Sequence, residues 1–415
     1  MLLLMSACGT PRPPMETATP QAPVTPKATH AGAATIPAPA ATPTSAATPA
    51  PVTPPPNFSQ MPPLQLWHAQ PPEWFAAALQ DFNRSNEWNI RLEARAFSDE
   101  NALLTALAAA ETPPDLLLAY PDQFTVSAQP ILLNPQGLFY NATRAAELGF
   151  AGAPTTVQEF VNQICAANLA FRNDSTPIND SEGGYLADTH PAAFAAWLMT
   201  FSGSLTAGES YLLNTDGTAE AVTFLKTLYD RRCIWQSAEP YPDELFASRR
   251  ALIVGGSLLD LPYQAEAMRL ADSSDEWLLL PYPARRGDPL LLALPLAAGV
   301  LTVEPEQQHA AELVINWLRT PETQAALVQH SGLLPAQAAA LPLLETYAAA
   351  HPQWGQAAQA LPYLQTQPAI ASWGRVQWLL HDVATQTYRT YFTIERIPDM
   401  LKELQSTAEE FSRNP

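Results

Sequence analysis

The sequence predicts an α/β protein of two lobes, each a mostly parallel sheet flanked by helices, with hinge crossovers joining them. Strand-like and helix-like segments alternate from residue 64 onward, which is the pattern of parallel sheets with right-handed crossovers. Residues 130–141 hold two short apolar runs separated by Pro135 and Gly137, which favours two extended pieces with a kink between them. Such a segment suits a chain that crosses between lobes, and 415 residues are enough for two domains.

The charge balance argues against two classes of partner. The chain has 21 Lys and Arg against 40 Asp and Glu, a formal net charge of -19. A nucleic-acid partner would require a basic face on the protein, and so would electrostatic docking onto anionic lipid. No segment has the ~20 consecutive apolar residues of a membrane-spanning helix. We therefore expect no nucleic-acid partner and no integral membrane segment.

The first residues resemble the end of a bacterial lipoprotein signal. Met5-Ser6-Ala7-Cys8 follows a short apolar run, and Cys8 stands where such signals carry the lipid. Residues 1–8 are therefore interpreted as a truncated signal with lipidation at Cys8; the alternative is a chance Leu-rich start with an ordinary cysteine. Residues 9–63 are rich in Pro, Thr and Ala and nearly uncharged. They are expected to be a disordered tether, because they offer too little apolar surface to fold.

Residues 64–120 follow the order strand, helix, strand, helix, strand. Apolar spacing predicts strands at 64–68, 90–96 and 114–120, and helices at 73–86 and 101–110. In an open sheet of this order, ligands bind beyond the carboxyl ends of the strands. Those ends carry Trp67, His68 and Gln70 after the first strand, and Tyr120 and Asp122 after the third.

These segments resemble a known family. LQLWHAQ, FAAALQDFN, IRLEARAF and LLTALAAAETPPDLLLAY within 64–120 are similar to the opening of the extracellular solute-binding proteins of ABC importers, family 1, the maltose- and sugar-binding type. Residues 137–141 resemble the Tyr-Asn crossover of that family, and 311–336 closely resemble its C-terminal helical block. The resemblance covers residues 64–415. It implies a two-lobed periplasmic-binding-protein-like fold of type II.

The second half of the chain fits the same family. Residues 154–160 resemble a helix start of the family, and the residues themselves agree, because Thr155 or Thr156 can cap a helix with Glu159 completing a capping box. Residues 246–257 resemble a helix and strand of the family, with Arg249 in a turn where glycine is common. The apolar run 290–303 contains Pro295 and Gly299, which suits a second crossover strand better than one long helix.

Two cysteines, Cys165 and Cys233, fall in the second lobe. In an exported protein such a pair favours a disulfide; the alternative is two separate buried thiols. No Cys-x-x-Cys or His-x-x-x-His spacing accompanies them, so we expect no metal site, and no cofactor is expected either.

The predicted organisation is a first lobe of residues 64–138 plus about 294–340 and a second lobe of 139–293 plus about 341–415. The resemblance implies that a solute binds between them, against aromatic faces, amides and carboxylates. Trp373 is the strongest single candidate, as a stacking aromatic. The candidate ligand-binding residues are Trp67, His68, Gln70, Tyr120, Asp122, Asn134, Tyr185, His190, Ser257, Tyr263 and Trp373.

The function that the resemblance implies is capture of a small solute, a sugar or oligosaccharide, by hinge closure and its delivery to ABC permease subunits. The protein would act as a monomer, held to the outer face of the cell membrane by the lipid on Cys8. Two alternatives stay open: a tethered ligand sensor for a membrane signalling protein, and a secreted glycoside hydrolase. The sequence has no Walker loop, Gly-x-Ser-x-Gly or His-Glu-x-x-His motif, so we expect no enzyme.

Overall fold

The computed structural model describes residues 56–124, 126–237 and 242–413. Cys8 and most of the expected tether lie outside these ranges. In the described ranges, every helix is too short or too polar to cross a lipid bilayer.

One large sheet contains strands of both lobes. Its strands are β1 (Leu64–His68), β2 (Leu92–Ala96), β3 (Leu116–Ala119), β4 (Ala128–Asn141), β5 (Gly183–Leu186), β8 (Ile234–Trp235), β9 (Ala251–Ser257), β10 (Trp277–Leu280), β11 (Leu291–Val300), β12 (Leu334–Pro335) and β13 (Leu364–Thr366). β6 (Thr206–Ala207) and β7 (Ser210–Tyr211) form a separate hairpin.

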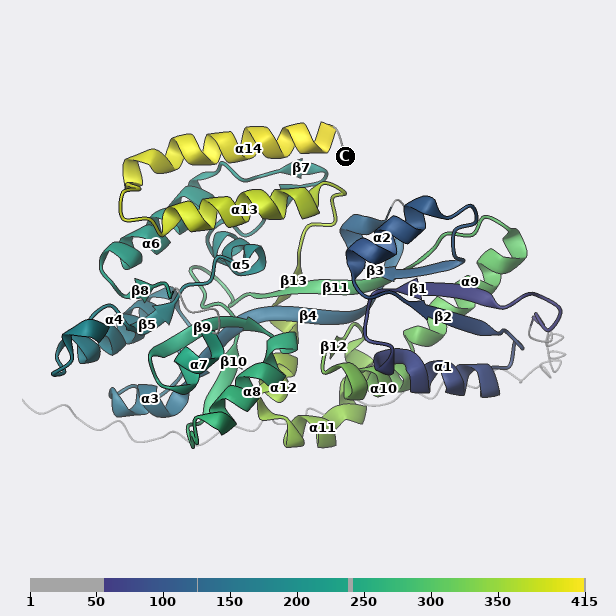
Figure 1. Ribbon diagram of the computed structural model, residues 1–415, viewed down its shortest axis with the longest axis horizontal. Coiled ribbons are helices and arrows are strands. Elements are labelled where there is room, and N and C mark those ends of the chain that lie inside the picture. The colour runs from purple at the N-terminus through teal and green to yellow at the C-terminus, as the bar shows by residue number, and fades with distance from the viewer. Residues whose placement is uncertain (1–55, 125, 238–241, 414–415) are drawn as a thin grey trace, which may run out of the picture. The chain divides into compact units, whose positions relative to one another are not determined.

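The helices flank this sheet (Figure 1). The α-helices are α1 (Glu73–Ser85), α2 (Glu100–Ala109), α3 (Ala142–Glu147), α4 (Val157–Arg172), α5 (Pro191–Ser202), α6 (Asp216–Asp230), α7 (Pro242–Ala247), α8 (Leu261–Leu270), α9 (Pro305–Leu318), α10 (Pro321–Ser331), α11 (Glu345–Ala350), α12 (Pro352–Gln359), α13 (Trp373–Thr387) and α14 (Ile397–Arg413). Short 3₁₀ turns include η1 (Pro121–Gln123) and η3 (Leu258–Asp260).

The strand order is β2-β1-β3-β11-β4-β9-β5-β8. β1, β2 and β3 are parallel to one another in the first lobe, and β5, β8 and β9 are parallel in the second. β4 and β11 lie between these two parallel groups and are antiparallel to each other. The predicted class, two mostly parallel sheets joined by crossover strands, is confirmed.

The crossing strand β4 is paired along both edges. Leu132 and Leu133 pair with β11 on one edge and with β12 on the other. Farther along, residues 138–140 pair with β9 on one edge and with β10 on the other. The sequence predicted two extended pieces with a kink, and this is wrong, because β4 is one continuous strand. Partners on both edges satisfy its backbone in each lobe and keep it extended.

Other local expectations hold with small shifts. Thr156 caps α4 and Glu159 completes the capping box. The apolar run after residue 290 forms the crossover strand β11, as expected. β2 begins at Leu92, two residues later than predicted. The expected tether extends too far, because Phe58 is buried in the first-lobe core and its N–H donates to the carbonyl of Trp88.

The Cys165–Cys233 disulfide is present, and its partners are separated by 68 positions in the sequence. Cys165 lies in α4, and Cys233 immediately precedes β8. The bridge therefore joins a helix to an edge strand of the second lobe. This confirms the pairing that exported cysteines favoured and sets aside the alternative of two free thiols.

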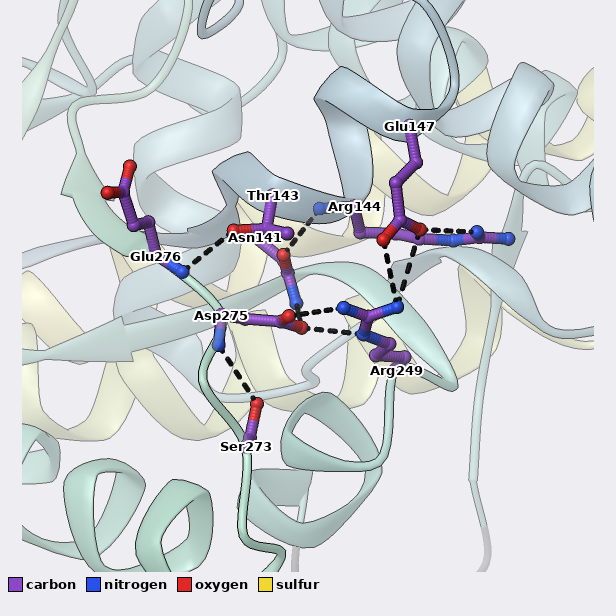
Figure 2. Close-up of polar contacts among 8 residues, drawn as sticks. All are labelled: Asn141, Thr143, Arg144, Glu147, Arg249, Ser273, Asp275 and Glu276. Carbon is purple, nitrogen blue, oxygen red and sulfur yellow. Dashed lines mark hydrogen bonds and ion pairs between the residues drawn. The ribbon is translucent and has the colours of Figure 1, made fainter.

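A buried carboxylate fastens the far end of β4 (Figure 2). Asp275, whose side chain is 2% exposed, accepts hydrogen bonds from Asn141 Nδ2 at 2.7 Å and from Arg249 Nε at 2.8 Å. Arg249 also donates to Glu147 Oε1 at 3.1 Å. Arg249 has a φ of 62°, the left-handed conformation that glycine adopts most easily.

The network joins three segments. Asn141 ends β4, Arg249 sits in the turn before β9, and Asp275 precedes β10. The hydrogen bond from Arg249 is the main cause that holds the pKa of Asp275 below its ordinary value of 3.8. A depressed carboxyl pKa stabilises the fold above the ordinary pKa, and the contribution is lost as the pH falls through the folded value.

We predict that Asp275→Asn lowers the free energy of unfolding by about 1–3 kcal/mol at pH 7, because Arg249 and Asn141 lose a charged acceptor in a buried position. Urea denaturation followed by circular dichroism measures this loss. The difference between wild type and variant should begin to narrow as the pH falls below about 4, where the carboxyl of the unfolded chain becomes protonated, and should disappear below the lowered pKa of the folded state.

Asp81→Asn is the matched control, because Asp81 pairs with Arg84 on the surface of α1, with both side chains at least 66% exposed. Exposed pairs of this kind contribute about 0–1 kcal/mol. Equal losses in the two variants would contradict a special role for Asp275.

Candidate functional site

The carboxyl ends of the parallel strands of both lobes lie near the same segment of β4. Ala119, at the end of β3, pairs with Ala297 of β11, so β3 runs toward the half of β11 that pairs with Asn134 and Gln136. In the second lobe Ser257, the last residue of β9, pairs with Gln136. The segment from Asn134 to Gln136 therefore lies between the two sets of strand ends, where ligands bind in sheets of this kind.

The first-lobe strand ends carry several of the predicted ligand-binding residues. His68 is buried, its ring packs 5.3 Å from that of Phe75, and its Nδ1 lies 3.1 Å from the carbonyl of Gln70. Burial lowers the pKa of His68, so the ring is neutral at pH 7. The Trp67 side chain does not join this group. It packs against the ring of Phe97, and the guanidinium of Arg95 lies over the Trp67 ring. His68 and Trp67 thus contribute mainly to packing within the lobe.

Gln70, Tyr120 and Asp122 form the polar part of this end. The side chain of Gln70 lies beside the Tyr120 hydroxyl. Burial raises the pKa of Tyr120 to about 12, and the nearby Glu100 carboxylate acts in the same direction. Burial also raises the pKa of Asp122, which the backbone N–H of Gly374 in the second lobe partly opposes. These groups present a phenol, an amide and carboxylates at one strand edge.

A second polar cluster lies at the second-lobe strand ends. A Cβ built on Gly255 would lie 3.7 Å from Gln136 Nε2, 3.7 Å from the Tyr185 hydroxyl and 3.6 Å from Asp188 Cβ. These three side chains therefore converge over one glycine of β9. Burial raises the pKa of Asp188. The Tyr185 hydroxyl accepts a hydrogen bond from Trp197 Nε1 at 3.3 Å.

The remaining predicted residues are spread more widely. Asn134 lies in the middle of β4, and its Oδ1 is buried without a hydrogen-bond partner among the described residues. His190 caps α5 and donates its N–H to Asp188, while Ser257 is bonded to Asp260. Tyr263 stands apart from the strand ends. It is 68% exposed on α8 and lines an outer groove against α7.

Trp373, the strongest sequence candidate, is buried. It is 1% exposed, its Nε1 donates to Gln367 Oε1 at 2.9 Å, and its ring stacks 6.3 Å from that of Tyr211. Trp373 is the first residue of α13, and the two rings are inclined by 28°. In this structure its indole is therefore a buried part of the second-lobe core.

Sequence reasoning missed three polar residues that belong with this region: Gln136, Asp188 and Gln367. Asp188 follows β5 as Asp122 follows β3, so the rule that selected the end of β3 would have found it had it been applied to β5. Gln136 and Gln367 have no comparable sequence signal, because a lone glutamine beside a proline or a glycine is typical of a loop. Their positions near the strand ends follow only from the pairing of β4 and β11 and from the hydrogen bond between Gln367 and Ala293 of β11.

The chemistry of the two clusters favours some solutes over others. Amide, phenol and carboxylate groups can donate to and accept from hydroxyl groups. Within the described residues, no Lys or Arg pairs with Glu100, Asp122, Asp188 or Asp260. An anionic solute would therefore meet carboxylates of like charge, with His190 and His381 as the only opposing groups that the described residues place near Asp188. Nor do the described residues hold a cluster of His, Cys, Asp and Glu suited to a metal ion.

Comparison with known proteins identifies the family. The family described as "Bacterial extracellular solute-binding protein" matches residues 125–360, more than half of the chain. The chain belongs to this family. A bacterial extracellular solute-binding protein captures a small molecule rather than transforming it, so the family is one of binding proteins and not of enzymes. No curated protein matches the sequence significantly.

Solved structures support the fold of this solute-binding protein. The cyclic alpha-maltosyl-1,6-maltose binding protein from Arthrobacter globiformis is 17% identical, with a TM-score of 0.68 over 85% of this chain and 99% of that one. The sugar-binding protein MalE from Xanthomonas citri is 15% identical, with a TM-score of 0.69 over 85% and 98% of the two chains. M. tuberculosis UspC is 15% identical, with a TM-score of 0.64 over 84% and 99%. At these identities the likeness concerns the fold alone.

We predict that Trp373→Ala lowers the free energy of unfolding by about 3–5 kcal/mol, because it removes a buried indole and leaves a cavity. Thermal denaturation followed by circular dichroism measures the loss. Trp378→Ala is the control on the same helix, since Trp378 is 74% exposed, and it should change stability by less than about 0.5 kcal/mol. Similar effects in both variants would show that Trp373 is not part of the core.

Proposed function

We propose that this solute-binding protein captures a neutral, hydroxyl-rich solute, a sugar or oligosaccharide, between its lobes and delivers it to the permease of an ABC importer. The observation that carries the proposal is the convergence of two polar strand-end clusters on the middle of β4; the carboxylates of these clusters, Asp122 and Asp188, form no ion pair with a described Lys or Arg. Relatives of the same fold are described as binding a cyclic maltosyl-maltose and sugars, which agrees with this solute class.

The proposed mechanism is closure about the crossing strands. β4 and β11 join the lobes, so a change in their twist at Asn134–Gln136 would move the two strand-end clusters relative to each other. A solute that contacts both clusters favours the closed conformer in proportion to its greater affinity for it. Gln70, Tyr120 and Asp122 from the first lobe, with Gln136 and Asp188 from the second, are the residues we assign to solute contact. The permease would then recognise the closed monomer.

A thermal-shift screen of the full chain tests the proposal. The panel contains neutral mono- and oligosaccharides, the corresponding sugar phosphates, polyols and amino acids. A solute that binds only the folded state raises the melting temperature, by an amount that follows from its concentration relative to Kd. We expect a shift with at least one neutral saccharide and a much smaller one with its phosphorylated form. A shift only with amino acids, or a larger one with sugar phosphates, would contradict the assignment.

We also propose that a lipid on Cys8 holds the protein at the outer face of the cell membrane. The support is the sequence Met5-Ser6-Ala7-Cys8 together with membership in an extracellular family. A lipid at this position, followed by 49 residues before the buried Phe58, would keep the binding site near a permease.

Metabolic labelling tests the anchor in a bacterial host that processes lipoproteins, with the chain extended by a basic n-region. The wild-type chain should incorporate an alkyne fatty acid and sediment with membranes, whereas Cys8→Ser should lose the label and become soluble. Ser6→Ala is the control, because a small residue is retained beside the cysteine, and it should stay labelled. Unlabelled wild-type protein would exclude the anchor.

A further inference from the structure

One carboxylate of the first lobe touches the backbone of the second. Asp122 lies in η1, immediately after β3, and its Oδ2 is 2.8 Å from the position that a Cβ on Gly374 would occupy. Gly374 is the second residue of α13, which packs mainly against α5, α14 and α6 of the second lobe. Figure 1 shows this end of α13 reaching toward α2 and β3. The contact therefore crosses the region between the two strand-end clusters.

The Asp122 carboxylate serves as the hydrogen-bond acceptor for a backbone N–H in the first turn of α13. The first N–H groups of a helix have no partner within the helix, and a side chain at the N-cap often satisfies one of them. The N-cap residue of α13, Ser372, makes no such bond; its hydroxyl instead lies 2.9 Å from that of Tyr211. The Gly374 N–H faces Asp122 of the opposite lobe. A negative charge at this end is also favoured by the helix dipole.

The charge of Asp122 is not balanced by an ion pair in the part of the chain that the structure describes. Within the described residues, no Lys or Arg forms an ion pair with it, and the nearest carboxylate, Glu100, has the same charge. Glu100 is itself bonded to Gln123 Nε2 at 3.0 Å. Besides its own backbone N–H, the positive end of α13 is the favourable electrostatic environment that the described residues offer this half-buried carboxylate.

Gly374 is the residue that permits the approach. A methyl group at this position would meet Asp122 Oδ2 at 2.8 Å, closer than van der Waals contact allows. The obstructing atom is the end of a side chain and not backbone, so the carboxylate would move away and the helix would stay in place. Glycine is otherwise a poor choice at a helical position, since alanine has the higher helix propensity.

We propose that Asp122 and the first turn of α13 form a latch that holds the two lobes together in the absence of solute. The inference rests on the proposed motion about β4 and β11. The latch biases the unliganded protein toward the closed conformer, and opening the lobes exposes both the carboxylate and the Gly374 N–H to water. The unliganded protein would then populate the closed conformer before a solute binds, and the free energy of the latch would determine the fraction of closed molecules.

Distance measurements by double electron–electron resonance on the full chain test the latch without any solute. Spin labels are placed at Glu111→Cys, after α2 in the first lobe, and Glu209→Cys, in the β6–β7 turn of the second, on a Cys8→Ser background; both sites are exposed. We expect Gly374→Ala to shift the distribution to longer distances and to lower the closed-to-open ratio about two- to tenfold. Its melting temperature should not fall, because alanine favours the helix.

A second variant and a control separate the latch from nonspecific effects. Asp122→Asn keeps an oxygen acceptor of the same size without the charge, and should shift the distribution in the same direction by a smaller amount. Gly152→Ala adds a methyl group in a second-lobe loop where no atom lies within 4 Å of it, and should leave the distribution unchanged. Wild-type distances from Gly374→Ala and Asp122→Asn, or a wild-type protein that is only open, would overturn the latch. Since no sugar is present, neither result depends on the solute assignment.

Discussion

The structure depends on the backbone pairing of a single 14-residue strand. β4 passes from one lobe to the other through the interior, where every unpaired N–H or C=O would carry a free-energy cost. β12 and β11 satisfy it in the first lobe, and β9 and β10 in the second. Pro135 and Gly137 are accommodated within this pairing. Gly137 in particular could not be alanine, because a Cβ there would lie 2.6 Å from the carbonyl oxygen of Leu280.

The pairing of β4 also fixes where chemistry can occur. Because β9 and β11 are held in register with it, the ends of β3 and β9 point at the same short segment, and polar residues from distant parts of the chain gather there. At its far end, the Asp275 network holds β4 to the turn before β9. β4 and β11 carry the sheet from the first lobe to the second, and one apolar cluster contains residues of both lobes, such as Leu66 and Val254. In the proposed motion, a small change in the twist of these strands would move the two polar clusters relative to each other.

Asp122 of the first lobe lies close to residues of both lobes. It lies at the carboxyl end of β3, where the solute would be held, and it also reaches the first turn of α13 in the opposite lobe. In the proposed mechanism this residue would couple occupancy of the site to lobe closure, because contact with a solute and contact with α13 would draw on the same carboxylate. Two apolar clusters lie on either side, one around α2 and one around α13, and they are not continuous with each other.

The sequence by itself determined the alternation of strands and helices, the crossover strand β11, the capping box of α4 and the family. These follow from local spacing and residue type, which act within a few turns of chain. Tertiary structure decided that β4 is continuous, that Phe58 belongs to the core, and that Trp373 is buried beside Tyr211 while Asp188 and Gln136 meet over Gly255. Burial and register depend on residues that lie from about 30 to more than 150 positions apart, so no local pattern contains them. The contact between Asp122 and Gly374 belongs to this second kind, since it exists only because two lobes place a strand end opposite a helix end.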